Sequence, residues 1–279
     1  MSTASPSKVL STHLDQILAH TASVVAERKS VADAGELQRR ALAHTPRGFA
    51  AALRRQRETG TRPAVIAELK KASPSKGLIR GNFQPAELAR TLEASGASAL
   101  SVLTDEKFFQ GGLENLQIAS GTVRIPCLRK DFMIDPFQML EARAHQADAI
   151  LLIVAALTDD QLLLLSRAAA EQQLDVLCEV HDAAELDRAL RLHEQAPVQM
   201  IGVNSRDLRT FVVDPQVQLE LAPRIPSDVV RIAESGIRTH ADIDRLTQAG
   251  YDAFLIGETL MRQPDPAAAL ALLLDRVAE

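Results

Sequence analysis

The feature that most constrains the fold is a pattern that recurs eight times after residue 63. In each repeat, a short apolar run ends in a polar residue, a loop follows, and then comes a stretch with helical periodicity. The runs are AVIAELK (64–70), ALSVLT (99–104), IPCLRKD (125–131), AILLIV (149–154), DVLCEV (175–180), QMIGVN (199–204), VVRIAESG (229–236) and AFLIGE (253–258). Apolar strands that alternate with helices pair in parallel, so eight of them predict an α/β fold, the closed (β/α)8 TIM barrel.

The alternative is an open, doubly wound sheet. Its common forms have roughly five or six strands, and those that bind dinucleotides carry a glycine fingerprint that this chain lacks. The barrel is therefore favoured, over residues 63–279. Residues 1–62 fall outside the repeat, and the stretches 12–30 and 49–60 have the pattern of amphipathic helices. We expect an N-terminal helical extension that packs on the barrel within a single functional domain.

Composition excludes several classes of partner. The formal net charge is -5 and no long basic tract occurs, so neither nucleic acid nor a membrane is predicted as a partner. The longest apolar run, 149–157, is too short to span a bilayer, and the first residues lack the apolar core of a signal peptide. Cys127 and Cys178 lack the paired spacing of a redox or zinc motif, and the histidines lack ligand spacing. The prediction is a cytoplasmic protein without a metal.

Side-chain alternation predicts which residues face the barrel interior. Glu68 and Lys70 share one face of the first strand, and Lys130 shares the parity of Phe132. In the fifth run, Glu179 lies on the face of Asp175 and Leu177, whereas Val176, Cys178 and Val180 face the helices. The inward set is completed by Asn204, Arg206 and Glu234.

These charged residues should converge where barrels hold their active sites, at the carboxyl ends of the strands. Taken singly, each could be a solvated loop residue. Together they favour a site for a charged substrate, because burying several ions costs several kcal/mol each unless they are paired.

The last two strand ends predict a phosphate site. The segments ESGI (234–237) and LIGETLM (255–261) place Ser235, Gly236 and Gly257 where the seventh and eighth strands turn into helices. Barrels commonly bind phosphate there through backbone N–H groups. A phosphorylated small-molecule substrate follows from this interpretation.

Six motifs in order resemble those of indole-3-glycerol-phosphate synthase of tryptophan biosynthesis. They are IAELKKASPSKG (66–77), SVLTDEKFFQGG (101–112), LRKDFMID (128–135), GVNSRDL (202–208), AESGI (233–237) and FLIGETLM (254–261). The resemblance runs from about residue 14 to the C-terminus. It implies that 1-(2-carboxyphenylamino)-1-deoxyribulose 5-phosphate is cyclised, decarboxylated and dehydrated to indole-3-glycerol phosphate, without cofactor or metal. It names no partner among the other tryptophan-pathway enzymes.

The resemblance also implies roles for individual residues. Lys130 would be the general acid and Glu179 the general base, with Glu68 and Lys70 beside the reacting centre and both lysines candidates for the acid in each step. Asn204 and Arg206 would orient the substrate and Glu68. Ser73, Glu234, Ser235, Gly236 and Gly257 would lie around its anionic groups, and Phe109 and Phe132 would hold the anthranilate ring. Glu258 stands where some members have Ser, so its carboxylate is expected to turn away from the phosphate.

Three other functions are weighed against the synthase. A phosphoribosylanthranilate-isomerase-like barrel would share the phosphate loops but has a cysteine near the end of the first strand, where this chain has Glu68 and Lys70. A non-catalytic scaffold would not need every catalytic position filled. A Schiff-base enzyme that uses Lys130 as nucleophile is distinguished by borohydride trapping.

Overall fold

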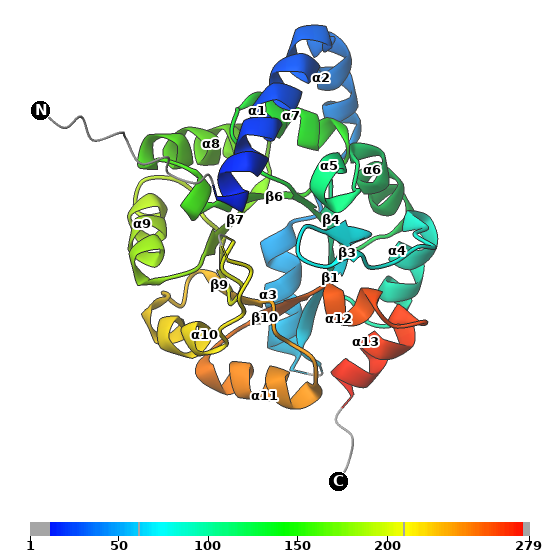
Figure 1. Ribbon diagram of the computed structural model, residues 1–279, viewed down its shortest axis with the longest axis vertical. Helices are drawn as coiled ribbons and strands as arrows, with labels where there is room; N and C mark the ends of the chain where they lie inside the picture. The colour runs from blue at the N-terminus through cyan, green and yellow to red at the C-terminus, as the bar shows by residue number, and fades with distance from the viewer. Residues whose placement is uncertain (1–11, 61, 209, 276–279) are drawn as a thin grey trace, which may run out of the picture.

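A closed barrel of eight parallel strands forms the centre of the molecule (Figure 1). The computed structural model describes residues 12–60, 62–208 and 210–275. The barrel strands are β1 (Ala64–Leu69), β4 (Ala99–Leu103), β5 (Cys127–Lys130), β6 (Ala149–Ile153), β7 (Asp175–Val180), β8 (Met200–Asn204), β9 (Val230–Glu234) and β10 (Ala253–Ile256). Each pairs with the next along the chain, and β1 pairs with β10 to close the ring. The predicted (β/α)8 fold is confirmed.

Helices surround the strands in the expected alternation. They are α4 (Pro85–Ala94), α5 (Glu106–Phe109), α6 (Leu113–Thr122), α7 (Phe137–Ala144), α8 (Asp159–Glu171), α9 (Ala183–His193), α10 (Gln216–Leu221), α11 (His240–Ala249), α12 (Glu258–Met261) and α13 (Pro266–Leu274). Capping explains where several begin: the side chains of Thr158, Thr239 and Asp182 accept hydrogen bonds from the first turns of α8, α11 and α9. The chain therefore changes from strand to helix at defined residues.

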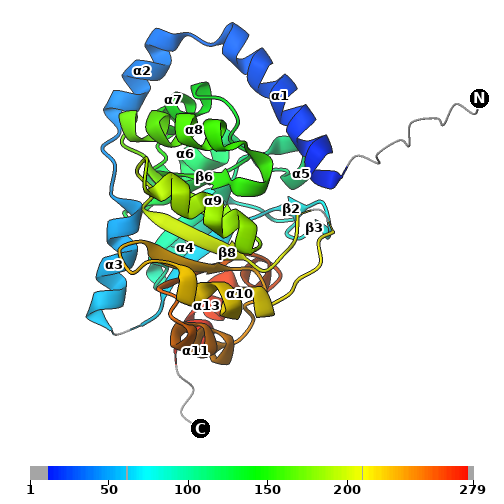
Figure 2. The same ribbon diagram turned by 90° about the vertical axis from the view of Figure 1, so that its left-hand side faces the viewer.

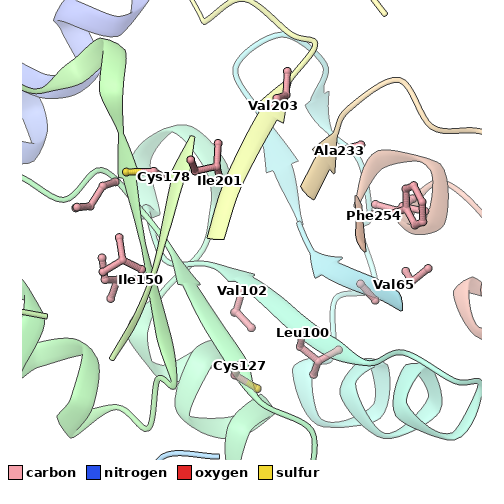
Figure 3. Packing of buried hydrophobic residues seen from close by; sticks show 14 of the residues in the cluster. Val65, Leu100, Val102, Cys127, Ile150, Cys178, Ile201, Val203, Ala233 and Phe254 are labelled. Atoms are coloured by element: carbon pink, nitrogen blue, oxygen red, sulfur yellow. The ribbon is translucent and has the colours of Figure 1, made fainter. Parts of the chain in front are cut away.

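Each strand separates two apolar layers, as alternation predicts. The outer layer packs against the helices, and Figure 3 shows one or two of its residues from every barrel strand, among them Val65, Cys178 and Phe254. The inner layer includes Ile66, Leu128 and other side chains of opposite parity, which fill the barrel. Apolar side chains thus fill the interior of the barrel, and the polar residues at the ends of the strands lie at its carboxyl end.

The N-terminal extension wraps around one side of the barrel. Its helices are α1 (His13–Val31), α2 (Ala34–Ala43) and α3 (Phe49–Thr59). Figure 2 shows them arching from α1, on the side of the barrel where the short strands β2 (Ala72–Ser73) and β3 (Gly77–Leu78) lie, to α3 at the opposite side. At the amino ends of the strands, Phe49 and Leu53 of α3 are fully buried in the inner layer.

Carboxylates of the barrel hold the N-terminal extension in place. Between α2 and α3, Nη2 of Arg47 lies 2.6 Å from Oδ2 of Asp148, and the backbone N–H of Ala50 donates to Asp175 over 2.8 Å. The two predicted helical stretches are confirmed, and α2 is an additional helix that packs on α7. The division into an extension of residues 1–62 and a barrel of 63–279 stays a prediction, and residues 1–11, where a signal segment was sought, lie outside the described part.

A short hairpin follows β1 where only a polar loop was expected. β2 (Ala72–Ser73) and β3 (Gly77–Leu78) pair antiparallel, and Gly77 has a φ of 63° that favours glycine.

Among the described residues, no helix combines the length and apolar character needed to cross a membrane.

Candidate active site

An open cavity of about 630 Å³ occupies the carboxyl end of the barrel. All the residues that the sequence points to lie along its wall, although they come from seven strand ends and loops spread over most of the chain. They are Glu68, Lys70, Ser73, Phe109, Lys130, Phe132, Glu179, Asn204, Arg206, Glu234, Ser235, Gly236, Gly257 and Glu258. The structure therefore brings the whole predicted set together. Their roles remain predictions.

Lys130 lies at the centre of a buried charge cluster. Its Nζ is 3.1 Å from Oε2 of Glu179 and 2.5 Å from Oε2 of Glu234. The lysine side chain is 13% exposed, through the cavity, whereas the two carboxylates are almost fully buried. A substrate in the cavity can thus meet the ammonium while both carboxylates hold it from behind.

Glu68 near the end of β1 and Lys70 directly after the strand form a second pair of charges. Nζ of Lys70 lies 2.6 Å from Oε1 of Glu68, so the two side chains on one face form an ion pair at the cavity wall. Gly257 makes room for this pair, because a methyl group at its Cα would overlap the Glu68 carboxylate. The glycine at the end of β10 therefore serves the charge cluster as well as the turn into α12.

The protonation states follow from burial and charge balance. Burial by itself would lower the pKa of Lys130, but the carboxylates of Glu234, Glu179 and Glu68 outweigh it and raise that pKa. Burial raises the pKa of Glu234 to about 8, with the Glu179 carboxylate adding to the rise. Burial by itself would raise the pKa of Glu179, but Lys130 and His181 outweigh it and lower that pKa. At neutral pH the cluster then holds an ammonium, an ionised Glu179 and a protonated Glu234.

Gly202, in the middle of β8, is a site residue that the sequence analysis missed. A methyl group here would overlap Oε1 of Glu234 and crowd Leu177, so only glycine leaves space for the Glu234 carboxylate beside Lys130. A lone glycine inside a strand is a signal of close approach that could have identified it.

The expected phosphate turn has an unusual backbone. Ser235 and Gly236, directly after β9, have φ values of 65° and 74°, both in the left-handed region. Serine adopts this region rarely, and such strain is typical of ligand-binding turns. Successive backbone N–H groups in turns of this kind form concave sites for anions.

Glu258 lies in the cavity wall, and two arginines pair with its carboxylate: Oε2 lies 3.3 Å from Nη2 of Arg206, and Oε1 lies 2.9 Å from Nε of Arg262. Its orientation relative to a bound phosphate stays a prediction. The two guanidinium groups lower the pKa of Glu258 against the opposing effect of its burial. Arg262, which directly follows α12, is thus a second cation at this wall. The sequence analysis did not select it.

Aromatic and amide side chains complete the wall. The rings of Phe109 and Phe132 lie 6.4 Å apart at 41°, and both face the cavity. Oδ1 of Asn204 accepts a hydrogen bond from the backbone N–H of Arg206 over 3.0 Å and so fixes the start of the following loop. The cavity wall therefore offers aromatic rings and cations besides Lys130.

His181 also contacts the cluster, from behind. Its Nε2 lies 3.3 Å from Oε1 of Glu179. The sequence analysis set this histidine aside because it lacks metal-ligand spacing, yet its position two residues after Glu179 on the same strand face was the signal of contact. Within the described ranges, no group of three or more His, Cys, Asp or Glu side chains is arranged to hold a metal ion.

Comparison with known proteins gives one family. The model of the family described as indole-3-glycerol phosphate synthase matches residues 14–273. The indole-3-glycerol phosphate synthase of Koribacter versatilis is 57% identical over 265 residues, which is 95% of this chain and 100% of that protein. The enzyme of the same name from Rhodospirillum rubrum is 48% identical over 262 residues, 94% of this chain and 98% of that protein.

Solved structures of lower identity share the fold alone. A 3-hexulose-6-phosphate synthase superposes with a TM-score of 0.60 at 15% identity, over 75% of this chain and 97% of that one. Phosphoribosylanthranilate isomerase from Thermotoga maritima gives 0.53 at 15% identity, over 76% of this chain and 96% of that one. The isomerase considered from the sequence is therefore a relative in architecture, whereas the sequence likeness lies with the synthases.

Proposed function

Because the chain belongs to the indole-3-glycerol phosphate synthase family, we propose that it converts 1-(2-carboxyphenylamino)-1-deoxyribulose 5-phosphate to indole-3-glycerol phosphate, carbon dioxide and water. The observation that supports this most is Lys130, a buried ammonium that two carboxylates hold at an open cavity. The reaction needs an acid at a carbonyl oxygen, a base nearby and a place for the substrate's carboxylate, phosphate and aromatic ring. The cavity offers groups of each kind.

Ring closure is the first chemical step. The ring carbon that carries the carboxylate attacks the ribulose carbonyl, and negative charge develops on the carbonyl oxygen. Lys130 donates a proton to that oxygen, and general acid catalysis of this kind accelerates a step by a factor of ~10² to 10⁴. Its raised pKa keeps Lys130 protonated until the oxygen becomes basic enough to take the proton.

Decarboxylation and dehydration complete the sequence. The carboxyl group leaves as carbon dioxide and its bonding electrons return to the ring system. The protonated oxygen then leaves as water while Glu179 removes a proton from the substrate, which restores the aromatic indole. Glu179 suits this role because its lowered pKa keeps it ionised. Lys70 is placed to meet the substrate's anions and, like Lys130, to supply the proton of the dehydration.

The remaining wall residues account for binding. The rings of Phe109 and Phe132 would flank the anthranilate ring, and the turn at Ser235 and Gly236 would hold the phosphate through backbone N–H groups. Ser73, Gly257 and the cations beside Glu258 lie around the same wall. We also propose a cytoplasmic location, which the two free, buried cysteines suit.

Product fluorescence tests the proposed function. The chain has no Trp and one Tyr, so a new indole signal stands out against the protein background. The wild-type chain should produce indole fluorescence from the substrate, and Glu179→Gln should slow its appearance by a factor of ~10² or more. Asp187→Asn, an exposed carboxylate on α9, is the matched control and should leave the rate unchanged.

Two outcomes would favour the alternatives. Binding of the substrate without an indole signal would move the isomerase-like and scaffold functions forward. A mass increase at Lys130 after borohydride treatment in the presence of substrate would instead indicate a Schiff base. Our proposal predicts fluorescence and no such adduct, since Lys130 acts through its proton.

A further inference from the structure

His181 is held between two carboxylates at the end of β7, behind the cavity. Its Nε2 lies 3.3 Å from Oε1 of Glu179, and its Nδ1 lies 2.9 Å from Oε2 of Glu185. The ring is 5% exposed, and His181 is absent from the residues that line the cavity. Any influence on a substrate must therefore pass through Glu179.

Seven consecutive residues, EVHDAAE (179–185), build this arrangement. β7 ends at Val180 and His181 follows directly, two residues after Glu179, with its ring beside the Glu179 carboxylate. Asp182 caps α9 by accepting from the backbone N–H of Glu185, which directs the Glu185 side chain back towards the strand. There its Oε2 also accepts from the backbone N–H of His181, over 2.8 Å. One carboxylate thus fixes both the backbone and the ring of His181.

The charges around Glu179 come from four strand ends. Lys130 faces its Oε2 from β5, Glu234 approaches the same ammonium from β9 and Glu68 from β1, and His181 faces its Oε1 from the opposite side. Burial by itself would lower the pKa of His181, but the carboxylates of Glu179 and Glu185 outweigh it and raise the pKa to about 10. The ring therefore carries a positive charge at neutral pH.

We propose that His181, anchored by Glu185, is a positioning residue that holds Oε1 of Glu179 and keeps this carboxylate ionised while its other oxygen meets Lys130. The proposal deepens the proposed function and rests on it, because it takes Glu179 to be the base. Lys130 is shared with Glu234 and contacts only Oε2 of Glu179. The imidazolium supplies the second positive charge, on the side that the substrate does not occupy.

Kinetics of His181→Gln test this role. The change takes positive charge away from Glu179 and raises its pKa, so the base is protonated at a higher pH. The acid limb of the pH profile of kcat/KM should then move upward by about one unit, so that kcat/KM on that limb falls by about tenfold while the rate at pH 8 changes little. KM should change by less than about threefold, because His181 does not line the cavity.

A matched control separates this from a merely structural role. His145 is a half-buried histidine at the end of α7 whose Nδ1 contacts the carbonyl of Glu141, away from the cavity. His145→Gln should keep the wild-type pH profile. An acid limb that stays in place in His181→Gln, or a loss of kcat that is equal at every pH, would overturn the proposal.

A readout without substrate distinguishes failure of this proposal from failure of the proposed function. In protein with ¹³C-labelled histidine, the His181 ring should remain an imidazolium at pH 8, and its pKa should fall by about one unit or more in Glu185→Gln. A ring that is neutral at pH 8 in the wild-type chain would contradict the positioning role whatever the turnover. Absence of indole formation by the wild-type chain would contradict the proposed function instead.

Discussion

Arg129 and Lys130 are consecutive cations on β5 that the strand sends into different surroundings. Arg129 points out of the barrel and is fully buried, with Nη2 lying 3.0 Å from Oδ2 of Asp131 and 2.8 Å from Oε2 of Glu141. Its other N–H groups donate to Thr104 and to the carbonyl of Gln138. Lys130 points into the barrel and meets two carboxylates, but its ammonium also faces the open cavity.

The two cations differ in whether their N–H groups can still bind a substrate. The guanidinium of Arg129 is surrounded by protein groups and does not line the cavity, so its interactions serve the folded structure. The ammonium of Lys130 can exchange protein partners for a substrate oxygen. A buried ion pair is weak support for stability in itself, but losing one partner is costly because the other charge remains buried. We therefore expect Arg129 to carry stability and Lys130 to carry chemistry, and the following changes test that division.

Lys130→Met should have the largest effect. Without the acid, kcat should fall by a factor of ~10² to 10⁴ while the chain stays folded, because Glu234 already holds a proton and no large repulsion is left behind. Product fluorescence gives kcat, and urea unfolding gives stability. Lys29→Met removes an exposed lysine that pairs with Asp135 and should leave both unchanged. Turnover within tenfold of wild type would refute the assignment of Lys130.

Arg129→Met should act on stability. The change leaves the Asp131 carboxylate buried without its cation and Glu141 with Arg28 alone, at 3.7 Å, which costs about 3–5 kcal/mol of unfolding free energy. Urea unfolding measures it, and Arg39→Met, which breaks an exposed pair with Glu36, is the control and should cost under about 1 kcal/mol. A cost as small as the control's would mean that Arg129 is not structural.

Gly202→Ala should have an intermediate effect on both properties. The added methyl group overlaps Glu234, so we expect a cost of about 1–3 kcal/mol and a lower kcat as Glu234 moves from Lys130. Gly81→Ala is the matched control, because nothing lies within 4 Å of a methyl group there. Equal unfolding midpoints for the two variants would show that the Glu234 carboxylate has other space.

The pH dependence of stability tests the protonation of Glu234. The pKa of Glu234 is raised to about 8 in the folded chain against an ordinary value of 4.5. The folded state therefore binds this proton more tightly than the unfolded state. Its contribution to the free energy of unfolding is complete below pH 4.5 and is lost as pH rises to about 8. The loss is at most about 1.4 kcal/mol per pH unit. Glu234→Gln should remove this slope between pH 5 and 8, and an identical slope in both proteins would contradict the shift.

The inward-facing charges could be predicted because strand alternation is a local property. Once AVIAELK, IPCLRKD and DVLCEV are identified as strands, the directions of Glu68, Lys130 and Glu179 follow, and the closed barrel brings them to one end. The membership in the synthase family is likewise carried by ordered motifs in the sequence. These parts of the site needed no coordinates.

The rest depends on partners that are distant in sequence or on single close contacts. Arg129 meets Glu141 from α7, and Glu258 meets Arg206 from the loop after β8, which no local pattern indicates. The β2–β3 hairpin is too short to leave a periodic signal, and α2 is mostly exposed and polar. His181 was tested as a metal ligand, which it is not placed to be, rather than as a neighbour of Glu179.

Turnover per folded molecule of Arg129→Met and Lys130→Met tests the central claim most directly. Both variants are compared with wild type by indole fluorescence under conditions where circular dichroism shows each of them folded. The division predicts that Arg129→Met turns over within about threefold of wild type, whereas Lys130→Met is slower by a factor of ~10² or more. Equal losses in the two variants would contradict it, because neighbouring cations on β5 would then serve the same purpose.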